Sequence, residues 1–178
     1  LHPIIRDVVR FELPLTEEDA EPFLSAFNET IKEEKSWHYP IITKCYYGDI
    51  ASEIISVFNK INDYTLELYK NVEILFSFAV KPAAAVELAA KLFGYYSEKH
   101  GERSFMCGYY AFQAGWTYLF NLQLKDAIKN AKEWFDRSYN IFDGLKLITQ
   151  NEFAVYGHLL SHLSRINLII FEGNKDDN

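Results

Sequence analysis

The stretch from Ser104 to Phe142 constrains the fold more than any other part of the chain. It reads as two helices of similar length joined by a turn at 121–124. The first helix carries Gly115 and Tyr118, and the second opens on Ala127. Small residues at such positions let two helices approach closely enough for the aromatic rings beside them to interlock. The spacing therefore predicts a tightly packed helical hairpin.

The second helix of this hairpin has a counterpart earlier in the chain, at a constant shift of 42 residues from Ala85 to Ala127. The same shift places Gly115 on Glu73 and Tyr118 on Phe76, so the first helix matches less well. Chance similarity between two alanine-rich helices is the alternative to a repeat. A third copy after residue 150 has no certain register. The matched pairs are Ala85 with Ala127, Ala89 with Ala131, Leu92 with Trp134, and Phe93 with Phe135.

The rest of the chain also follows helical spacing, and no segment alternates with period two over a useful length. We expect an all-α fold built from helical hairpins. Turns are expected at Gly48, at 143–144 and at 173–174. Within the helix at 17–35 the predicted buried stripe is Phe23, Phe27 and Ile31, with Leu24 alongside. The expected helices are 3–13, 17–35, 49–61 with Asp49 as its cap, one starting at Asn62, and one from Pro82 that ends at a Gly101 cap.

Composition excludes several classes of function. The net charge of −7 and the absence of a basic stripe argue against direct nucleic-acid contact. No run of about 18 apolar residues predicts a membrane span. Cys45 and Cys107 lie far apart without CxxC spacing, which indicates reduced thiols of a cytosolic protein, acting as small buried hydrophobic residues.

Gly115, Tyr118 and Ala127 fall at the small, aromatic and alanine positions of a tetratricopeptide repeat, which the hairpin resembles. The resemblance implies a right-handed TPR-like α–α superhelix. Such stacks of hairpins are binding scaffolds rather than reaction centres. The chain is thus expected to bind a protein or peptide, or a small-molecule effector.

The first ten residues, Leu1-His2-Pro3-Ile4-Ile5-Arg6-Asp7-Val8-Val9-Arg10, resemble the segment that closes the winged-helix part of bacterial STAND (NB-ARC-like) ATPase regulators. The stretch 21–27 is similar to their linker helix. The resemblance implies that 1–14 is the tail of the winged-helix domain and 15–62 a helical linker or degenerate repeat. Residues 63–178 would then be TPR-like repeats in an array truncated at its C-terminal end, whose exposed apolar segment 168–171 could pair end to end with a second copy.

This resemblance implies a cytoplasmic sensing module of a bacterial transcriptional regulator, which controls an upstream NTPase. The chain has no GxxxxGK[ST] loop, so we expect no nucleotide hydrolysis, no catalytic residues and no cofactor in this fragment. The alternative is a free-standing TPR adaptor or scaffold. A helical enzyme using His158 and His162 is a third hypothesis, which no catalytic constellation supports.

The candidate ligand groove follows from the resemblance, since the first helix of each TPR hairpin lines the concave face. Core packing is the alternative for any aromatic row at helical spacing. His158 and His162 have the spacing of two zinc ligands but lack a third, so we expect surface or groove histidines and no metal. The groove candidates are Lys70, Ile74, Phe78, Tyr109, Phe112, Trp116 and Phe120.

Overall fold

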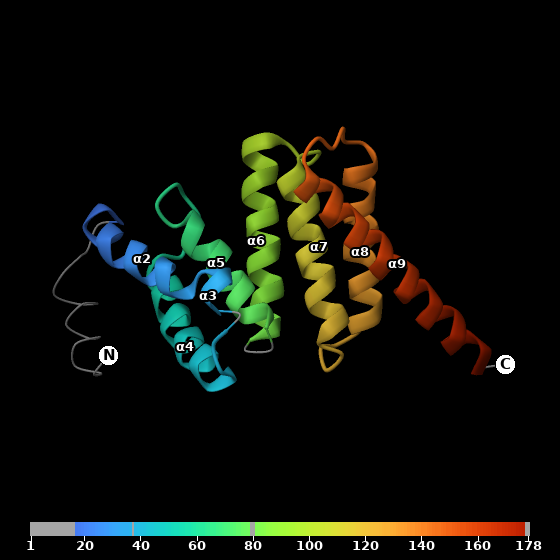
Figure 1. Cartoon of the computed structure of the whole chain (residues 1–178), viewed down its shortest axis with the longest axis horizontal. Coiled ribbons are helices and arrows are strands. Elements are labelled where there is room, and N and C mark those ends of the chain that lie inside the picture. Colours follow the sequence, from blue (N-terminus) through green and yellow to red (C-terminus); the bar gives the residue numbers. More distant parts are fainter. Residues whose placement is uncertain (1–16, 37, 79–80, 177–178) are drawn as a thin grey trace. The chain divides into compact units, whose positions relative to one another are not determined.

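The computed structural model describes residues 17–36, 38–78 and 81–176, and within them it contains helices and turns but no strand (Figure 1). The predicted all-α fold is confirmed for this part of the chain. Its residues form two compact units that divide between Val72 and Glu73, inside helix α5 (Leu66–Ser77). The division expected from the sequence precedes that helix. The expected helix at 3–13 lies outside the described residues.

The first unit contains α2 (Glu17–Ile31), the short α3 (Glu33–Ser36), α4 (Ile41–Val57) and the beginning of α5. The buried face of α2 is Ala20, Leu24, Phe27 and Ile31, which follow one side of a helix. Phe23 is 49% exposed, so its predicted place in the buried stripe is wrong. Leu24 occupies that place because it continues the spacing of Ala20 and Phe27.

Helix α4 corrects the prediction of a break at Gly48. The helix begins after Pro40 and runs through Gly48, which is buried, so Asp49 lies inside it and is not a cap. Packing of the small residue outweighs the intrinsic helix penalty of glycine. The next helix, α5, begins at Leu66 and not at the predicted Asn62. Asn62 lies in the turn before it, where its Oδ1 accepts hydrogen bonds from the backbone N–H groups of Tyr64 and Thr65 at 3.0 Å.

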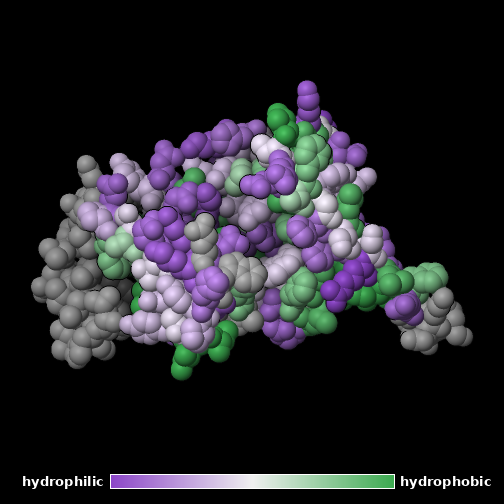
Figure 2. All heavy atoms as spheres, viewed as in Figure 1, coloured by the Kyte–Doolittle hydropathy of each residue, from purple (hydrophilic) through white to green (hydrophobic). Residues whose placement is uncertain are grey.

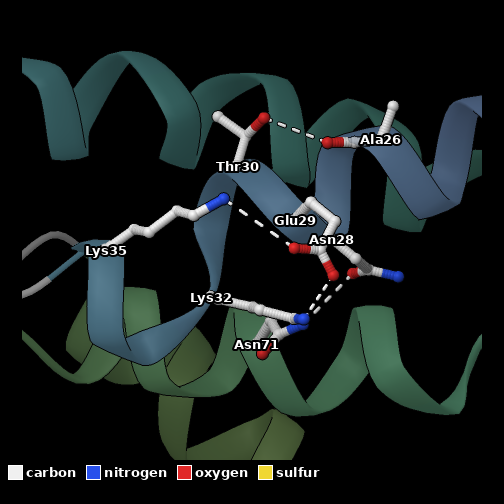
Figure 3. A network of polar contacts seen from close by, with 7 residues as sticks. All are labelled: Ala26, Asn28, Glu29, Thr30, Lys32, Lys35 and Asn71. Carbon is white, nitrogen blue, oxygen red and sulfur yellow. Dashed lines mark hydrogen bonds and ion pairs between the residues drawn. The ribbon is translucent and has the colours of Figure 1, made fainter.

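A polar network joins the end of α2 to α5 within the first unit (Figure 3). The Asn71 Nδ2 donates to the Asn28 Oδ1 at 3.4 Å. Glu29 forms ion pairs with Lys32 and Lys35, and the hydrogen bond from Lys32 is the main reason that its carboxyl pKa is lowered. These charged side chains are about half exposed, so the ion pairs add little to stability.

The second unit contains α6 (Pro82–His100), α7 (Phe105–Phe120), α8 (Ala127–Asp143) and α9 (Gln150–Asp176). Helices α6, α7 and α8 pack as successive neighbours, and α9 crosses α8 and α7 before its last turns project beyond them (Figure 1). Gly101 follows α6 with φ +82° and ψ 155°, a conformation that favours glycine. The turn predicted at 173–174 is wrong, since α9 continues through these residues.

Helices α6 and α8 bury equivalent positions at the shift of 42 residues. Within α6, Ala85, Ala89 and Leu92 are fully buried, and within α8 the equivalent alanines and Phe135 are buried as well. Phe93, the counterpart of Phe135, is buried as well, whereas Trp134, the counterpart of Leu92, is only partly buried and meets the Phe93 ring edge to face at 6.2 Å between centroids. The two helices therefore share one spacing of buried residues at three of the four matched positions.

Candidate functional site

Helix α7 is held against α8 by two glycines that face phenylalanine rings. A Cβ on Gly108 would lie 2.5 Å from the Phe142 ring, and one on Gly115 would lie 2.5 Å from the Phe135 ring. The two glycines and the two phenylalanines are each seven residues apart, as antiparallel helices in register require. The Ser138 hydroxyl also donates to the Gly108 carbonyl at 2.7 Å within the core. These contacts fix the rotation of α7 about its own axis, and they therefore determine which of its side chains face away from α8.

The partly exposed side of α7 carries Tyr109, Trp116 and Phe120, which we call the aromatic row. The rings of Trp116 and Phe120 lie 4.8 Å apart, and Phe120 is 51% exposed. Between these rings and Tyr109 lies Gln113, whose Nε2 donates to the Tyr109 hydroxyl at 2.6 Å. The row thus combines apolar rings with one carboxamide.

The residues predicted before α6 fall in different places. Phe78 meets Trp116 edge to face, with centroids 6.2 Å apart, and so extends the aromatic row. Ile74 is half-buried on α5. Lys70 belongs to the first unit, where its Nζ lies 2.7 Å from the Glu67 carboxylate. Of these three residues, Phe78 is the one with an established contact to the row.

Phe112 lies in the core and not on the exposed side of α7. It is 8% exposed, and its ring stacks on Phe135 at 5.8 Å. His162 of α9 lies 6.1 Å away. The row therefore passes from Tyr109 through Gln113 to Trp116, one residue beside the predicted position.

Helix α9 adds His162 and Arg165 to the end of the row. His162 was expected as a surface or groove histidine, whereas no sequence pattern pointed to Arg165. The His162 ring lies 5.7 Å from Phe120 and stacks on Phe135 at 5.9 Å. Burial among these rings lowers the histidine pKa, and the charges of His158 and Arg165 lower it further. The imidazole is consequently neutral near pH 7.

Arg165 supplies the positive charge of the site. Its guanidinium carbon lies 5.9 Å from the centroid of the Phe120 ring, within the range of a cation–π contact. It forms no ion pair with any residue that the structure describes. Partly exposed rings beside a cation without an ion pair among the described residues suit a ligand that has both an apolar part and a negative charge.

The two histidines four residues apart do not belong to a metal-ligand cluster. Over the described ranges, no three His, Cys, Asp or Glu side chains gather closely enough to hold a metal ion. His158 is exposed, whereas His162 lies among the rings. The spacing of the two histidines thus drew attention to His162, which lies beside the aromatic row, although the chemistry considered for the pair was metal binding.

The two cysteines differ from one another. Cys107 is fully buried, as predicted, but Cys45 is exposed on α4, so the prediction that both are buried is wrong. None of the described helices is both long enough and apolar enough to cross a bilayer. Comparisons of the chain with family models, curated proteins and solved structures find no match.

Proposed function

We propose that the chain is a non-catalytic, TPR-like module that binds a protein or peptide partner through the aromatic row. The observation that carries this proposal is the grouping of partly exposed rings on the closely packed helix α7 with Arg165 of α9, which forms no ion pair with a described residue. Trp116 and Phe120 offer apolar contact area, and Arg165 offers a charge beside them. Aromatic and arginine side chains of this kind dominate the energetics of protein interfaces.

The TPR-like architecture is supported by packing within the second unit. Alanines at equivalent positions of α6 and α8 are buried, and the glycines of α7 face rings of α8 at close range. Buried residues that recur at the same spacing in α6 and α8, two helices separated by one other helix, are expected of stacked helical hairpins. We therefore propose that these helices belong to a right-handed superhelix of such hairpins.

The chemistry of the row favours an extended peptide with apolar and acidic side chains. Apolar side chains would cover Trp116 and Phe120, and a carboxylate would pair with Arg165. The carboxamide of Gln113 has both donor and acceptor capacity for a peptide backbone. Because the neutral His162 imidazole adds no positive charge to that of Arg165, a peptide with one acidic group suffices to match the charge of the site.

The proposal is tested by selecting 12-residue peptides from a random library on the purified chain. Selected peptides should combine aromatic or aliphatic residues with Asp or Glu. Arg165→Gln should weaken their binding about tenfold, as expected for the loss of a partly exposed charged contact. Arg103→Gln, which removes another exposed arginine of the same unit, is the matched control.

Trp116→Ala gives the apolar half of the test, with Leu122→Ala as its control because Leu122 is 65% exposed in the following turn. Trp116→Ala should reduce binding by about tenfold or more if the ring is an interface anchor. Peptides that bind the Arg165 and Trp116 variants as tightly as the parent chain would place the interaction elsewhere and refute the proposal.

The cellular setting is proposed from the resemblance at residues 1–10, which lie outside the described residues. In that setting the row senses a ligand for a cytoplasmic bacterial transcriptional regulator with an NTPase module upstream. Adding a selected peptide to the full-length protein should then change its NTPase rate. A rate that does not respond to bound peptide would favour the alternative, an adaptor without such control.

A further inference from the structure

His162 lies where the aromatic row meets α9. Its ring is 5.7 Å from Phe120, and the Arg165 guanidinium is 5.9 Å from the same ring, so both groups reach the row at Phe120. The two residues are three apart on α9 and are therefore neighbours on one side of that helix. The imidazole is partly exposed, whereas Phe112 and Phe135, against which it packs, are buried. A ligand group at Phe120 would thus lie near both nitrogen-bearing side chains.

The imidazole of His162 makes ring contacts and no others within the described part of the chain. Neither of its nitrogen atoms forms a hydrogen bond or an ion pair with a described residue. In a neutral imidazole one nitrogen donates and the other accepts, and both donate once the ring is protonated. The rings therefore hold the imidazole in place and leave its hydrogen-bonding capacity to water or a ligand.

Among the described residues, no carboxylate pairs with His162. Helix α7 contains no Asp, Glu, Lys, Arg or His at all. The Asp136 carboxylate of α8 is held by Lys132 at 2.6 Å. One turn from the ring contacts on α7 and α8, and from His162 on α9, the titratable groups on the same helix side are Tyr109, Lys132, Tyr139, His158 and Arg165.

The charges that act on His162 are positive. Burial lowers the pKa of its imidazole most, and the charges of His158 and Arg165 lower it further. Glu172 lies ten residues later, about 15 Å along the axis at 1.5 Å per residue. It belongs to the last turns of α9, and Figure 2 shows hydrophilic side chains beside apolar ones on this projecting part. A carboxylate brought by a ligand would therefore be the first to pair with this imidazole, and it would favour the protonated ring.

We propose that a peptide on the aromatic row pairs a second acidic group with His162, and that this pairing takes up a proton, so the site prefers doubly acidic peptides as the pH falls. The pairing depends on the proposed function, because it needs a peptide on the row. The proton comes from the solvent and binds the free imidazole nitrogen, whose N–H then donates to the carboxylate.

The two charge states of the site select different peptides. At pH 8 the neutral imidazole leaves the charge of Arg165 alone at this end of the row, and one acidic group matches it. At pH 6 a doubly acidic peptide binds an imidazolium beside the guanidinium. Peptide carboxyl groups, whose ordinary pKa is about 4, stay ionised over this range, so the histidine is the group that changes.

The first test selects the random library of 12-residue peptides on the purified chain at pH 6.0 and at pH 8.0 in parallel. Peptides selected at pH 6.0 should carry more Asp and Glu than those selected at pH 8.0. Calorimetric titration with a peptide from the pH 6.0 selection should give a Kd about tenfold higher at pH 8.0, as expected for the loss of one charge-assisted hydrogen bond at a partly exposed site. Heats in two buffers of different ionisation enthalpy should show proton uptake at pH 7.0.

Three variants assign the proton. His162→Gln should abolish the uptake and flatten the pH dependence, because glutamine keeps a donor and an acceptor but does not titrate. His158→Gln is the matched control, since it removes an exposed histidine one turn earlier that contacts no described ring, and the pH dependence should persist. Arg165→Gln should weaken binding at both pH values and keep the pH dependence.

Nuclear magnetic resonance reads the same proton at its atom. The Cε1 proton of His162, assigned by its loss in His162→Gln, should report a higher pKa with the peptide bound than without it. Circular dichroism at each pH limits the comparison to the folded chain. An unchanged pKa, or uptake that persists in His162→Gln, would overturn the pairing and leave the proposed function intact. A library that yields no binding peptide at either pH would refute both.

Discussion

Gly115→Ala tests whether close packing of α7 against α8 determines the stability of the second unit. The added methyl carbon would lie 2.5 Å from Phe135 Cδ1, 2.7 Å from Cε1 and 3.0 Å from Cγ. The ring cannot turn away easily, because Phe135 is fully buried between Phe112 at 5.8 Å and His162 at 5.9 Å. Either the two helices separate or the stacked rings shift.

The magnitude follows from two opposing effects. Overpacking of a closed core costs about 1–3 kcal/mol, and contact with a confined ring places this site near 3 kcal/mol. Alanine recovers about 1 kcal/mol of helix propensity relative to glycine. We expect a net loss of about 2 kcal/mol in the free energy of unfolding, or about 4–8 °C in Tm for a chain of this size.

The assay is urea unfolding followed by circular dichroism, with Gly94→Ala as the control. That control gains helix propensity without a contact, so its effect should have the opposite sign. Replacing Phe135 by Leu in the Gly115→Ala chain should cost less than the same replacement in the parent chain, because the shorter side chain relieves the contact. Stabilisation by Gly115→Ala, or additive effects of the two substitutions, would refute the reasoning.

Three further predictions concern single groups. Ser138→Ala should lower the free energy of unfolding by about 1 kcal/mol in urea, since the buried 2.7 Å hydrogen bond to the Gly108 carbonyl is lost; no change would show that this bond does not contribute. The pKa of His162 is lower in the folded chain than its usual 6.5, so the unfolded chain takes up a proton at this histidine more readily than the folded chain does. The free energy of unfolding should therefore decrease as the pH falls below about 6.5. For His162→Gln, unfolding curves measured across this pH range should depend less on pH. A thiol reagent should modify one cysteine per native chain, Cys45, and reach Cys107 only after unfolding, because the Cys107 Sγ is fully buried; rapid modification of both would contradict the described packing.

Helix boundaries were predictable where a local residue determines them. Pro82 opens α6 and Gly101 follows it with positive φ, as their restricted and permissive backbones dictate. Ser104 caps α7 by accepting a hydrogen bond from the Cys107 N–H at 3.3 Å. The prediction of a helix break at Gly48 is wrong, because α4 accommodates this glycine through its burial, and no local sequence pattern reveals that burial.

The candidate site was predictable only in part. Helical spacing alone cannot distinguish Phe112 from Gln113 as the next member of the row, since the boundary between core and surface depends on where α8 and α9 pack. The contribution of Arg165 required the crossing of α9 over α7, a contact between residues far apart in the sequence.

The sequence by itself determined that the chain is helical, that Gly115 permits close approach, and that aromatic side chains follow one helix. These properties depend on backbone freedom and periodicity, which act over a few residues. Only the tertiary structure decided which rings are buried, that His162 lies among them, and that Arg165 of α9 lies beside Phe120. Burial is decided by neighbouring helices, because a side chain loses its water only where another surface replaces it.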